Sequence, residues 1–389
     1  MLRLWLFAGI LCSTRCVAQT NSPVLMTGKT TGLLSYLEYG LGDDRLGGAK
    51  MTYLDTNVVV KVVDSIYNDY KLQLSKNHFA YLPKINFKPD TLPTSRPYYL
   101  TGSWKVWGDS IYDYVAVSLD EQLPYRSQQL VNPSKITVDI FGATTNTNWI
   151  TQLASAEEVK NVYYEQTEDD VFRLTIELKH SHHWGYSIYY LDKRLTIKIK
   201  RQPAVLSLDK LKIAIDAGHG GTNTGASGKT TRVLEKDYTL KIAKELQKAL
   251  EQEKATVYMT RDKDTSLSMT ERWEMVKQQE PDLLISIHLN SSGKDSIQGV
   301  STYYKHIGFR PMTQFILKRM LETGLKEFGN IGSFNFTLNG PTDYPNCLVE
   351  VAFLSNPEDE KRILDPAFQI LTAQKITKGI KDWLRSIKN

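Results

Sequence analysis

Cysteine is scarce in this chain, whose 389 residues include three. Two of them, Cys12 and Cys16, lie among the first 20 residues, and the third is Cys347. If the beginning of the chain is removed, a single thiol remains, and no internal disulfide can form. Apolar cores must then hold the folded chain together, and about 370 residues are enough for two or three domains.

Long apolar runs are also missing. The apolar stretch nearest the N-terminus, Leu4–Leu11, follows Arg3 and is far shorter than the roughly 20 residues that span a bilayer. A basic residue, a short apolar stretch and a small residue, Ala18, before Gln19 are typical of a secretory signal peptide. We therefore predict that residues 1–18 are a signal peptide, that the protein is exported to the periplasm or cell envelope, and that it has no membrane span.

An excess of one charge sign is absent as well. The chain has 48 Lys and Arg residues and 43 Asp and Glu residues, so its net charge is +5. Removal of Arg3 and Arg15 with the signal peptide lowers this net charge to +3. Because the sequence has no basic cluster with interleaved aromatic residues, we expect no nucleic acid among the partners.

Two common short motifs are missing or incomplete. The chain has no His-Glu-x-x-His sequence, so no zinc site of that local type is expected. Gly225–Thr230 is similar to the end of a phosphate-binding loop, but such a loop requires a glycine five residues before Gly228, where Asn223 stands. We therefore expect no nucleotide to bind.

The second half of the chain does contain two histidines and two glutamates in four short segments. His219 follows an apolar run, His288 ends a second run, and Glu350 lies within a third. Glu235 begins a stretch in which apolar residues recur at helical spacing. Because sites in parallel α/β sheets assemble at the carboxyl ends of the strands, residues this far apart in sequence can converge there.

These residue types match the chemistry of a zinc hydrolase. Two imidazoles and one carboxylate are a ligand set for a catalytic zinc ion that keeps one coordination position open for water. A further carboxylate is what such a site needs to take a proton from that water. The four residues therefore predict a hydrolase with one zinc ion.

Each of the four residues also has a simpler interpretation. A histidine at the end of a strand is often a hydrogen-bonded structural residue, and Glu235 in the first turn of a helix can interact with the helix dipole. Glu350 is harder to explain in this way, because a carboxylate buried in an apolar strand costs several kcal/mol unless it has a partner. The presence of all four residues together favours the metal site.

In this order and spacing, the four segments resemble the zinc-dependent N-acetylmuramoyl-L-alanine amidases, the bacterial cell-wall amidases of the third amidase type. The matching segments are Gly218–Gly221, Glu235–Asp237, Ser286–His288 and Val349–Asn356. The resemblance covers about residues 208–389. It implies that His219, Glu235 and His288 bind zinc and that Glu350 is the catalytic carboxylate. It also implies that the substrate is peptidoglycan, cleaved at the amide bond between N-acetylmuramic acid and L-alanine of the stem peptide.

Three further residues are assigned to the surroundings of the site. Arg272 matches an arginine on a helix of the family. Asp216 and Asn290 stand two or three residues from the histidines and could orient the imidazoles or contact substrate, with a structural role in their turns as the alternative. Phe336–Pro341 stands where family members often have a Leu-Arg pair, which leaves the substrate contacts on that side open.

The first half of the chain has a different pattern. Residues 24–200 contain short alternating runs rich in Tyr, Val, Thr and Ile, broken by Asp, Asn, Gly and Pro, which predicts an all-β fold. Prolines cluster around residues 88–96, where we expect a linker between two modules.

Each of these two modules resembles a known kind of domain. Residues 103–200 are similar to AMIN-type β domains through segments such as Ile136–Ala143, and this resemblance implies that they bind peptidoglycan. Residues 25–88 look like a bacterial SH3-like barrel, through Gly47–Met51 among other segments. A plain β extension of the neighbouring domain is the alternative for residues 25–88.

The chain has one local histidine cluster, formed by His180, His182 and His183 between two predicted strands. Such a cluster can bind a metal, but no Asp, Glu or Cys stands in the turn to complete a site. We interpret the cluster as a solvated loop that connects a hairpin.

From about residue 208 the pattern alternates between strands and helices. Strands are expected at 211–216, 256–260, 283–288, 299–304 and 347–353, and helices at 235–252, 268–279, 311–328 and 366–387. This alternation predicts an α/β catalytic domain at 208–389, with a mostly parallel sheet flanked by helices, after the all-β modules. A polar, proline-containing junction at 201–203 predicts that the two halves can be separated.

Two other functions remain open from the sequence. A zinc peptidase acting on wall peptides would use the same ligands and base. A catalytically inactive protein that binds peptidoglycan would normally have lost a ligand or the base, whereas all four residues are present. Assays with intact peptidoglycan and with free stem peptide distinguish these functions.

Overall fold

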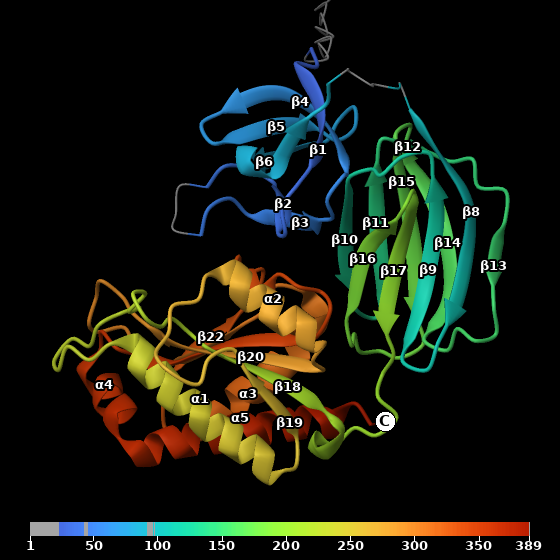
Figure 1. The fold of residues 1–389 in the computed structure, drawn as a ribbon. Helices are drawn as coiled ribbons and strands as arrows, with labels where there is room; N and C mark the ends of the chain where they lie inside the picture. The colour runs from blue at the N-terminus through green and yellow to red at the C-terminus, as the bar shows by residue number, and fades with distance from the viewer. Residues whose placement is uncertain (1–22, 43–45, 92–95, 97, 389) are drawn as a thin grey trace, which may run out of the picture.

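The computed structural model of the chain describes residues 23–42, 46–91, 96 and 98–388. The predicted signal peptide, residues 1–18, and two of the three prolines of the expected linker lie outside this part of the chain. Three units follow one another along the sequence: a small β-sheet, a β-sandwich and an α/β domain (Figure 1).

The first unit, which we call the N-terminal module, is a seven-stranded antiparallel sheet with the strand order β3-β2-β6-β5-β4-β1-β7. Its core contains alternate residues of the strands, such as Val60, Val62 and Leu72, which are buried. The strands are β1 Met26–Thr30, β2 Ser35–Glu38, β3 Lys50–Leu54, β4 Val59–Ile66, β5 Asp69–Gln73, β6 Phe79–Pro83 and β7 Phe87–Pro89, with a 3-10 turn at Lys84–Asn86. The all-β prediction is confirmed here, whereas the SH3-like character stays a prediction.

The second unit is a β-sandwich of two sheets, β10-β11-β15-β14 and β12-β8-β9-β17-β16, with β13 paired to β8. Trp104 of β8 and Phe172 of β15 are buried where the sheets meet, with ring centroids 5.9 Å apart. The strands are β8 Tyr99–Gly108, β9 Tyr112–Leu119, β10 Tyr125–Leu130, β11 Lys135–Phe141, β12 Ala143–Thr144, β13 Ile150–Gln152, β14 Val159–Glu168, β15 Val171–Leu178, β16 Tyr186–Leu191 and β17 Arg194–Lys200. The all-β prediction is therefore confirmed for this unit too.

The histidine cluster between β15 and β16 differs from the prediction of a solvated loop. His183 is 2% exposed, and its Nε2 lies 2.8 Å from the carbonyl oxygen of Leu130 and 3.2 Å from the hydroxyl of Ser134. His180 Nδ1 lies 2.5 Å from the carboxylate of Glu158. The prediction was wrong for His183, because the loop folds back onto the β10–β11 hairpin, which its local sequence does not reveal.

The third unit is built around one six-stranded sheet with the order β19-β18-β20-β23-β21-β22. Every neighbouring pair is parallel except β21 and β23, which are antiparallel. The strands are β18 Lys212–Ala217, β19 Thr256–Met259, β20 Leu283–Asn290, β21 Val300–Tyr303, β22 Glu327–Ile331 and β23 Asn346–Phe353. The prediction of a mostly parallel sheet is confirmed.

Helices cover both faces of this sheet, as Figure 1 shows. Ile213 and Ile215 of β18 face a core shared with α1, α3 and α5, whereas Ala214 between them faces Val276 of α2 and Leu338 on the opposite side. The helices are α1 Glu235–Gln252, α2 Met269–Gln279, α3 Arg310–Leu321, α4 Pro357–Leu364 and α5 Pro366–Ser386, with 3-10 turns at Leu208–Lys210, Ile307–Phe309 and Thr337–Asn339.

One predicted helix of this unit is too long. The expected helix at 311–328 ends at Leu321, and Gly324 follows with a φ of +82°, a conformation common just after helices. The chain then forms β22, a short edge strand that was not predicted. Its five residues lack a buried, alternating pattern, and Phe328, its second residue, is 45% exposed, so periodicity gives no strand signal.

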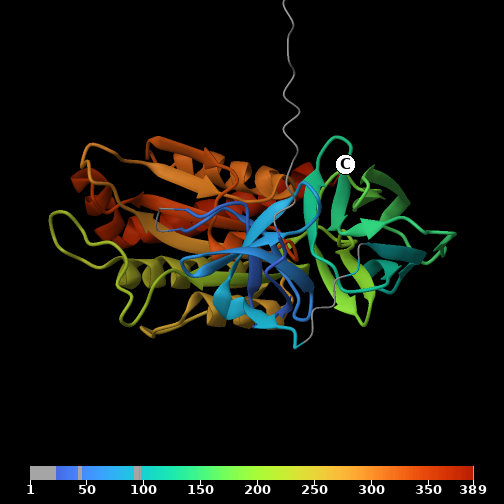
Figure 2. The ribbon, with the colours of Figure 1, turned by 90° about the horizontal axis from the view of Figure 1, so that it is seen from above.

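The three units contact one another rather than being joined by a bare linker. Figure 2, seen from above, shows the N-terminal module in front of the other two units. Trp184 of the sandwich belongs to the main core of the α/β domain, where its ring lies 5.3 Å from that of Trp383. The backbone N–H of Tyr186 donates to the carbonyl of Thr342, and the Thr342 hydroxyl donates back to Tyr186. The predicted separability at 201–203 therefore conflicts with buried contacts between the halves.

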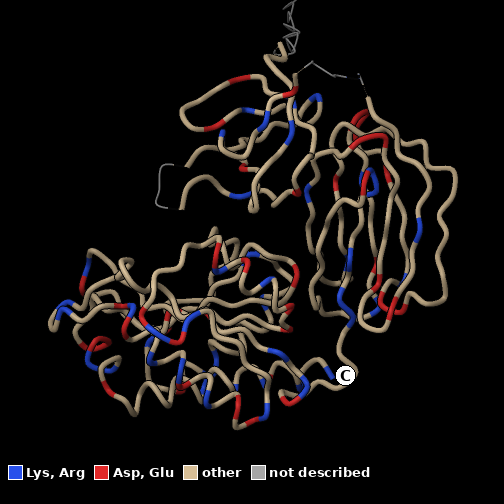
Figure 3. The backbone as a smooth tube through the Cα atoms, in the orientation of Figure 1, with Lys and Arg blue, Asp and Glu red and all other residues tan. Residues whose placement is uncertain are grey.

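Charge is distributed evenly over the three units. Figure 3 shows basic and acidic residues interspersed along the chain in each of them. Among the described residues, no helix is both long enough and apolar enough to cross a membrane.

Candidate active site

His219 lies on a loop directly after β18, at the carboxyl edge of the sheet. Its φ of 61° is unusual for a residue other than glycine. The preceding Gly218 has no room for a side chain, because a Cβ atom there would lie 2.5 Å from the ring of His288. Asn223 Oδ1 lies 2.9 Å from His219 Nδ1, while His219 Nε2 faces Glu235. The asparagine that breaks the phosphate-loop pattern therefore orients this imidazole.

Glu235 is the first residue of α1, and it is 4% exposed. Its Oε1 lies 3.1 Å from His219 Nε2 and 3.2 Å from His288 Nδ1. The backbone N–H groups of Ala226 and Leu289 also donate to this carboxylate. Burial disfavours the charged carboxylate, but the hydrogen bonds and charges of the two imidazoles hold the pKa of Glu235 well below its usual value.

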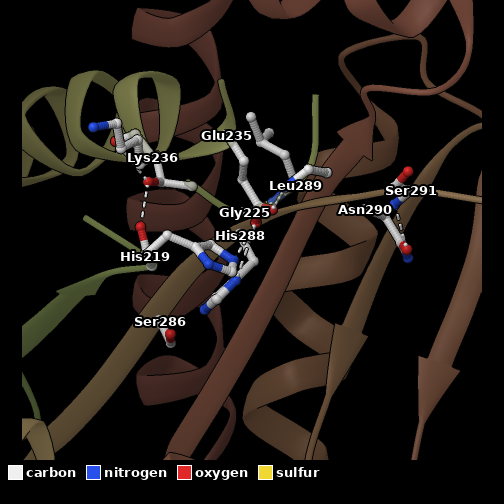
Figure 4. Close-up of polar contacts among 12 residues, drawn as sticks. His219, Gly225, Glu235, Lys236, Ser286, His288, Leu289, Asn290 and Ser291 are labelled. Carbon is white, nitrogen blue, oxygen red and sulfur yellow. Dashed lines mark hydrogen bonds and ion pairs between the residues drawn. The ribbon is translucent and has the colours of Figure 1, made fainter. Parts of the chain in front are cut away.

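His288 lies near the end of β20 and is buried. Figure 4 shows its ring beside that of His219, with the carboxylate of Glu235 directed towards both. The ring centroids of the two histidines are 4.9 Å apart. His288 Nε2 is buried and has no hydrogen-bond partner among the described residues.

These three side chains fit a zinc ion. One donor atom from each of them lies within 4.8 Å of the others, and no other group of three such residues is found in the described chain. Ligands bound at about 2.1 Å in a tetrahedral site are roughly 3.4 Å apart. The separations of 3.1 and 3.2 Å between the carboxylate and the imidazoles are close to that value. Two imidazoles and a carboxylate also match the preference of catalytic zinc for nitrogen and oxygen ligands.

Glu350 stands directly opposite His288 in the parallel pairing of β20 and β23. Residues paired in this way direct their side chains to the same face of a sheet. The neighbouring Val349 and Val351 face the opposite side, towards the core that includes α1. Glu350 is half-buried rather than enclosed. The register therefore places the fourth predicted residue on the same face of the sheet as His288, one strand away.

Asp216 and Arg272 form a buried ion pair beneath His219. Arg272 Nη1 lies 2.6 Å from Asp216 Oδ1 and also donates to the carbonyl of Ala217, while Nη2 donates to the carbonyl of His219. The hydroxyl of Ser286 donates to the other Asp216 oxygen. Burial opposes ionisation of Asp216, but the charge of Arg272 keeps its pKa below the usual value. The pair holds the backbone that bears His219 and has no recorded contact with an imidazole nitrogen.

Arg261 supports the same loop and was missed in the sequence. Its guanidinium donates to the carbonyl oxygens of Ala217 and Gly218 and to that of Lys236 on α1. It follows β19, more than 40 residues from the loop that it supports. No turn motif or metal-ligand motif includes Arg261, so its supporting role can be recognised only in the folded structure.

Asn290 lies beside the site but does not face the histidines. Its amide nitrogen is 3.3 Å from the hydroxyl of Tyr303, and its side-chain oxygen accepts from the backbone of Ser291. Figure 4 shows it directed away from His219 and His288. It therefore contacts β21, on the far side of β23, rather than an imidazole.

An aromatic wall borders the site on the side where the sequence departs from the family pattern. We use this name for Tyr303, Phe334 and Phe336. The ring of Phe336 lies 5.5 Å from that of His288, edge to face, and Phe334 lies 4.5 Å from Tyr303. Both phenylalanines are partly exposed. The sequence marked Phe336 only as a departure, and it gave no signal for Phe334.

Comparison with protein-family models agrees with this geometry. Residues 213–382 match the family described as N-acetylmuramoyl-L-alanine amidase, and residues 104–204 match the AMIN domain. Residues 213–382 form an amidase domain of this family. The match includes all four residues predicted from the sequence, and an AMIN domain precedes it.

Individual proteins similar to this chain have related names. A probable cell wall amidase, LytH of Staphylococcus aureus, is 36% identical over 170 residues, which are 43% of this chain and 57% of that protein. The chain thus covers little more than half the length of this relative. The catalytic domain of CwlV, an N-acetylmuramoyl-L-alanine amidase from Bacillus (Paenibacillus) polymyxa var. colistinus, is 33% identical, with 46% of this chain and 99% of that chain covered and a TM-score of 0.43. An N-acetylmuramoyl-L-alanine amidase from Clostridium difficile 630 is 29% identical, with 46% and 100% covered and a TM-score of 0.44.

The Asp216–Arg272 pair gives a prediction for stability. Asp216→Ala should lower the free energy of unfolding by about 3–5 kcal/mol, because it leaves the arginine charge buried without its partner. Denaturant unfolding measures this change. Asp295→Ala is the control, because Asp295 is exposed and should have little effect. Equal losses in the two variants would contradict the structural role of the pair.

Proposed function

We propose that this protein is a zinc-dependent hydrolase that cleaves the amide bond between N-acetylmuramic acid and L-alanine of the stem peptide in peptidoglycan. The observation on which the proposal rests is the convergence of His219, Glu235 and His288, with Glu350 opposite His288 on the next strand. The match of residues 213–382 to the amidase family supports the choice of bond.

Each residue has a distinct task in the proposed reaction. His219, Glu235 and His288 would hold the zinc ion, which when bound would supply a Lewis acid for the amide carbonyl and for the attacking water. Glu350 takes a proton from the attacking water as the new C–O bond forms at the lactyl carbonyl. Glu350 then donates this proton to the amine of L-alanine as the C–N bond breaks, so the carboxylate returns to its starting state.

The other groups keep the reacting residues in place. The ion pair of Asp216 with Arg272 fixes the backbone on both sides of Gly218, and Asn223 orients the ring of His219. Such supporting hydrogen bonds set the direction from which an imidazole meets its metal. Phe336 beside His288 shields one side of the site from water.

The β units belong to the same proposal. The AMIN domain at 104–204 would bind peptidoglycan and hold the enzyme at its polymer, which raises the local concentration of the catalytic site. The N-terminal module, predicted to be SH3-like, lies beside it (Figure 1). Substrate of this kind lies outside the cytoplasm, which supports export to the periplasm or cell envelope.

One digestion experiment tests the proposed bond. Purified protein with zinc is offered intact peptidoglycan and, separately, free stem peptide, and the products are identified by mass. We expect peptidoglycan to release stem peptides that begin with L-alanine, and free stem peptide to remain intact. Cleavage within the free peptide would identify a zinc peptidase instead, and binding without cleavage would identify an inactive wall-binding protein.

Variants of the four residues test their separate tasks. His219→Ala and His288→Ala should lose both stoichiometric zinc and activity, whereas Glu350→Ala should keep zinc and lose activity by a factor of roughly 100 or more. Zinc content by elemental analysis and amide cleavage measure these effects. Loss of zinc from a folded Glu350→Ala protein would overturn the assigned roles. Full zinc affinity in Glu235→Gln would show that Glu235 only interacts with the helix dipole.

A further inference from the structure

The segment between β22 and β23 is held from outside its own domain. Asn335 stands between Phe334 and Phe336, and its side chain makes three hydrogen bonds to the backbone of the N-terminal module. Its amide nitrogen donates to the carbonyl oxygens of Leu46 and Gly48, at 3.1 and 2.7 Å. Its side-chain oxygen accepts from the backbone N–H of Lys50, at 3.1 Å. Both N–H groups of the side-chain amide and one of the two lone pairs of its oxygen therefore take part in hydrogen bonds.

The turn that receives Asn335 has a shape that depends on glycine. Gly47 has a φ of +69°, in the left-handed region that favours glycine. A Cβ atom on Gly48 would lie 1.9 Å from the carbonyl oxygen of Gly40, so no side chain fits there. These two glycines begin the segment Gly47–Met51, through which the module resembles an SH3-like barrel. Its backbone geometry directs two carbonyls and one N–H to a single side chain.

Two further contacts join strand β3 of the module to the α/β domain, one of them to the same segment. The Lys305 ammonium, which follows β21, donates to the carbonyl of Lys50 at 2.9 Å. The ring of Tyr53 lies against Gly340, where a Cβ atom would be 2.5 Å from it. Figure 1 shows β2 and β3 at the end of the module that faces the α/β domain. The module therefore contacts the segment at Asn335 and at Gly340, and it also contacts Lys305 after β21.

The two neighbours of Asn335 reach β20, which bears His288, and β21, which pairs with the strand of Glu350. Phe336 lies against His288 of β20, as described above. Phe334 lies against Tyr303, whose hydroxyl is 3.2 Å from that of Ser301. Ser301 is paired directly with Glu350 in the antiparallel register of β21 and β23. A shift of the segment would move Phe336, which lies against His288. It would also move Phe334, which lies against β21 beside the strand of Glu350.

We propose that the N-terminal module positions the aromatic wall of the active site, with Asn335 as the positioning residue. The module is then a structural part of the amidase site. Attachment of the enzyme to the wall depends on the module, and so does the cleavage of small, soluble muropeptides. This inference rests on the proposed function, and it goes beyond it by assigning the module a task in substrate binding.

Kinetics on a soluble muropeptide test the inference in the full chain. Asn335→Ala removes all three hydrogen bonds, and Asn335→Asp keeps the acceptor but places negative charge against two carbonyls. We expect kcat/KM to fall about tenfold in Asn335→Ala and further in Asn335→Asp, mainly through a higher KM, because a displaced wall binds substrate less well. Zinc content should be unchanged in both variants.

Asn77→Ala is the matched control. Asn77 also lies where the module contacts another unit, but its amide donates to Glu168 of the sandwich, at 3.0 Å. Its loss removes an interdomain hydrogen bond without touching the segment that bears Asn335. We expect wild-type kcat and KM in this variant.

Hydrogen exchange provides a readout that does not need activity. The amides of residues 332–340 should exchange faster in Asn335→Ala than in the wild type, and at the wild-type rate in Asn77→Ala. Wild-type kinetics and wild-type exchange in Asn335→Ala would overturn the inference. If the wild-type protein with zinc cleaves no muropeptide, the proposed function fails, while the exchange rates still decide whether the module holds the segment.

Discussion

A buried carboxylate at the start of a helix is the constraint on which the site depends. Glu235 is nearly inaccessible, yet the surrounding groups keep its pKa low and hold it ionised. Two imidazoles, two backbone N–H groups and the N-terminal end of α1 all stabilise its negative charge. The imidazoles can approach it because β18 and β20 are adjacent and parallel and end at the same edge. A zinc ion among these donors would replace the contacts between them with bonds to the metal.

The surrounding fold keeps these donors converged. Beneath the loop of His219, two arginines engage the carbonyls that the loop leaves unpaired, and Asp216 balances the charge of Arg272. Beside the loop, the register of β20 with β23 places Glu350 opposite His288. Across the site, a turn of the N-terminal module holds Asn335. The proposed ligands, the proposed base and the aromatic wall therefore come from different elements, and their mutual positions depend on how these elements pack.

The sequence predicted the features that depend on neighbouring residues, namely most helices and strands and the types of residue at the site. Apolar periodicity located every long helix and the five strands that bear or flank the site, and the four reactive residues were recognised because their types match zinc chemistry. Periodicity does not reveal an exposed edge strand such as β22, nor where α3 stops. Burial of His183 and the roles of Arg261 and Asn335 depend on contacts between residues far apart in sequence. The local sequence around each of these residues does not predict such long-range contacts.

Anomalous scattering at the zinc edge, from crystals of the full chain grown with zinc, tests the central claim most directly. The account predicts one strong peak, about 2.1 Å from an imidazole nitrogen of His219, a carboxylate oxygen of Glu235 and an imidazole nitrogen of His288. Glu350 should lie near this peak without binding the metal. A zinc ion bound elsewhere, or one bound by Glu350 in place of Glu235, would contradict the account.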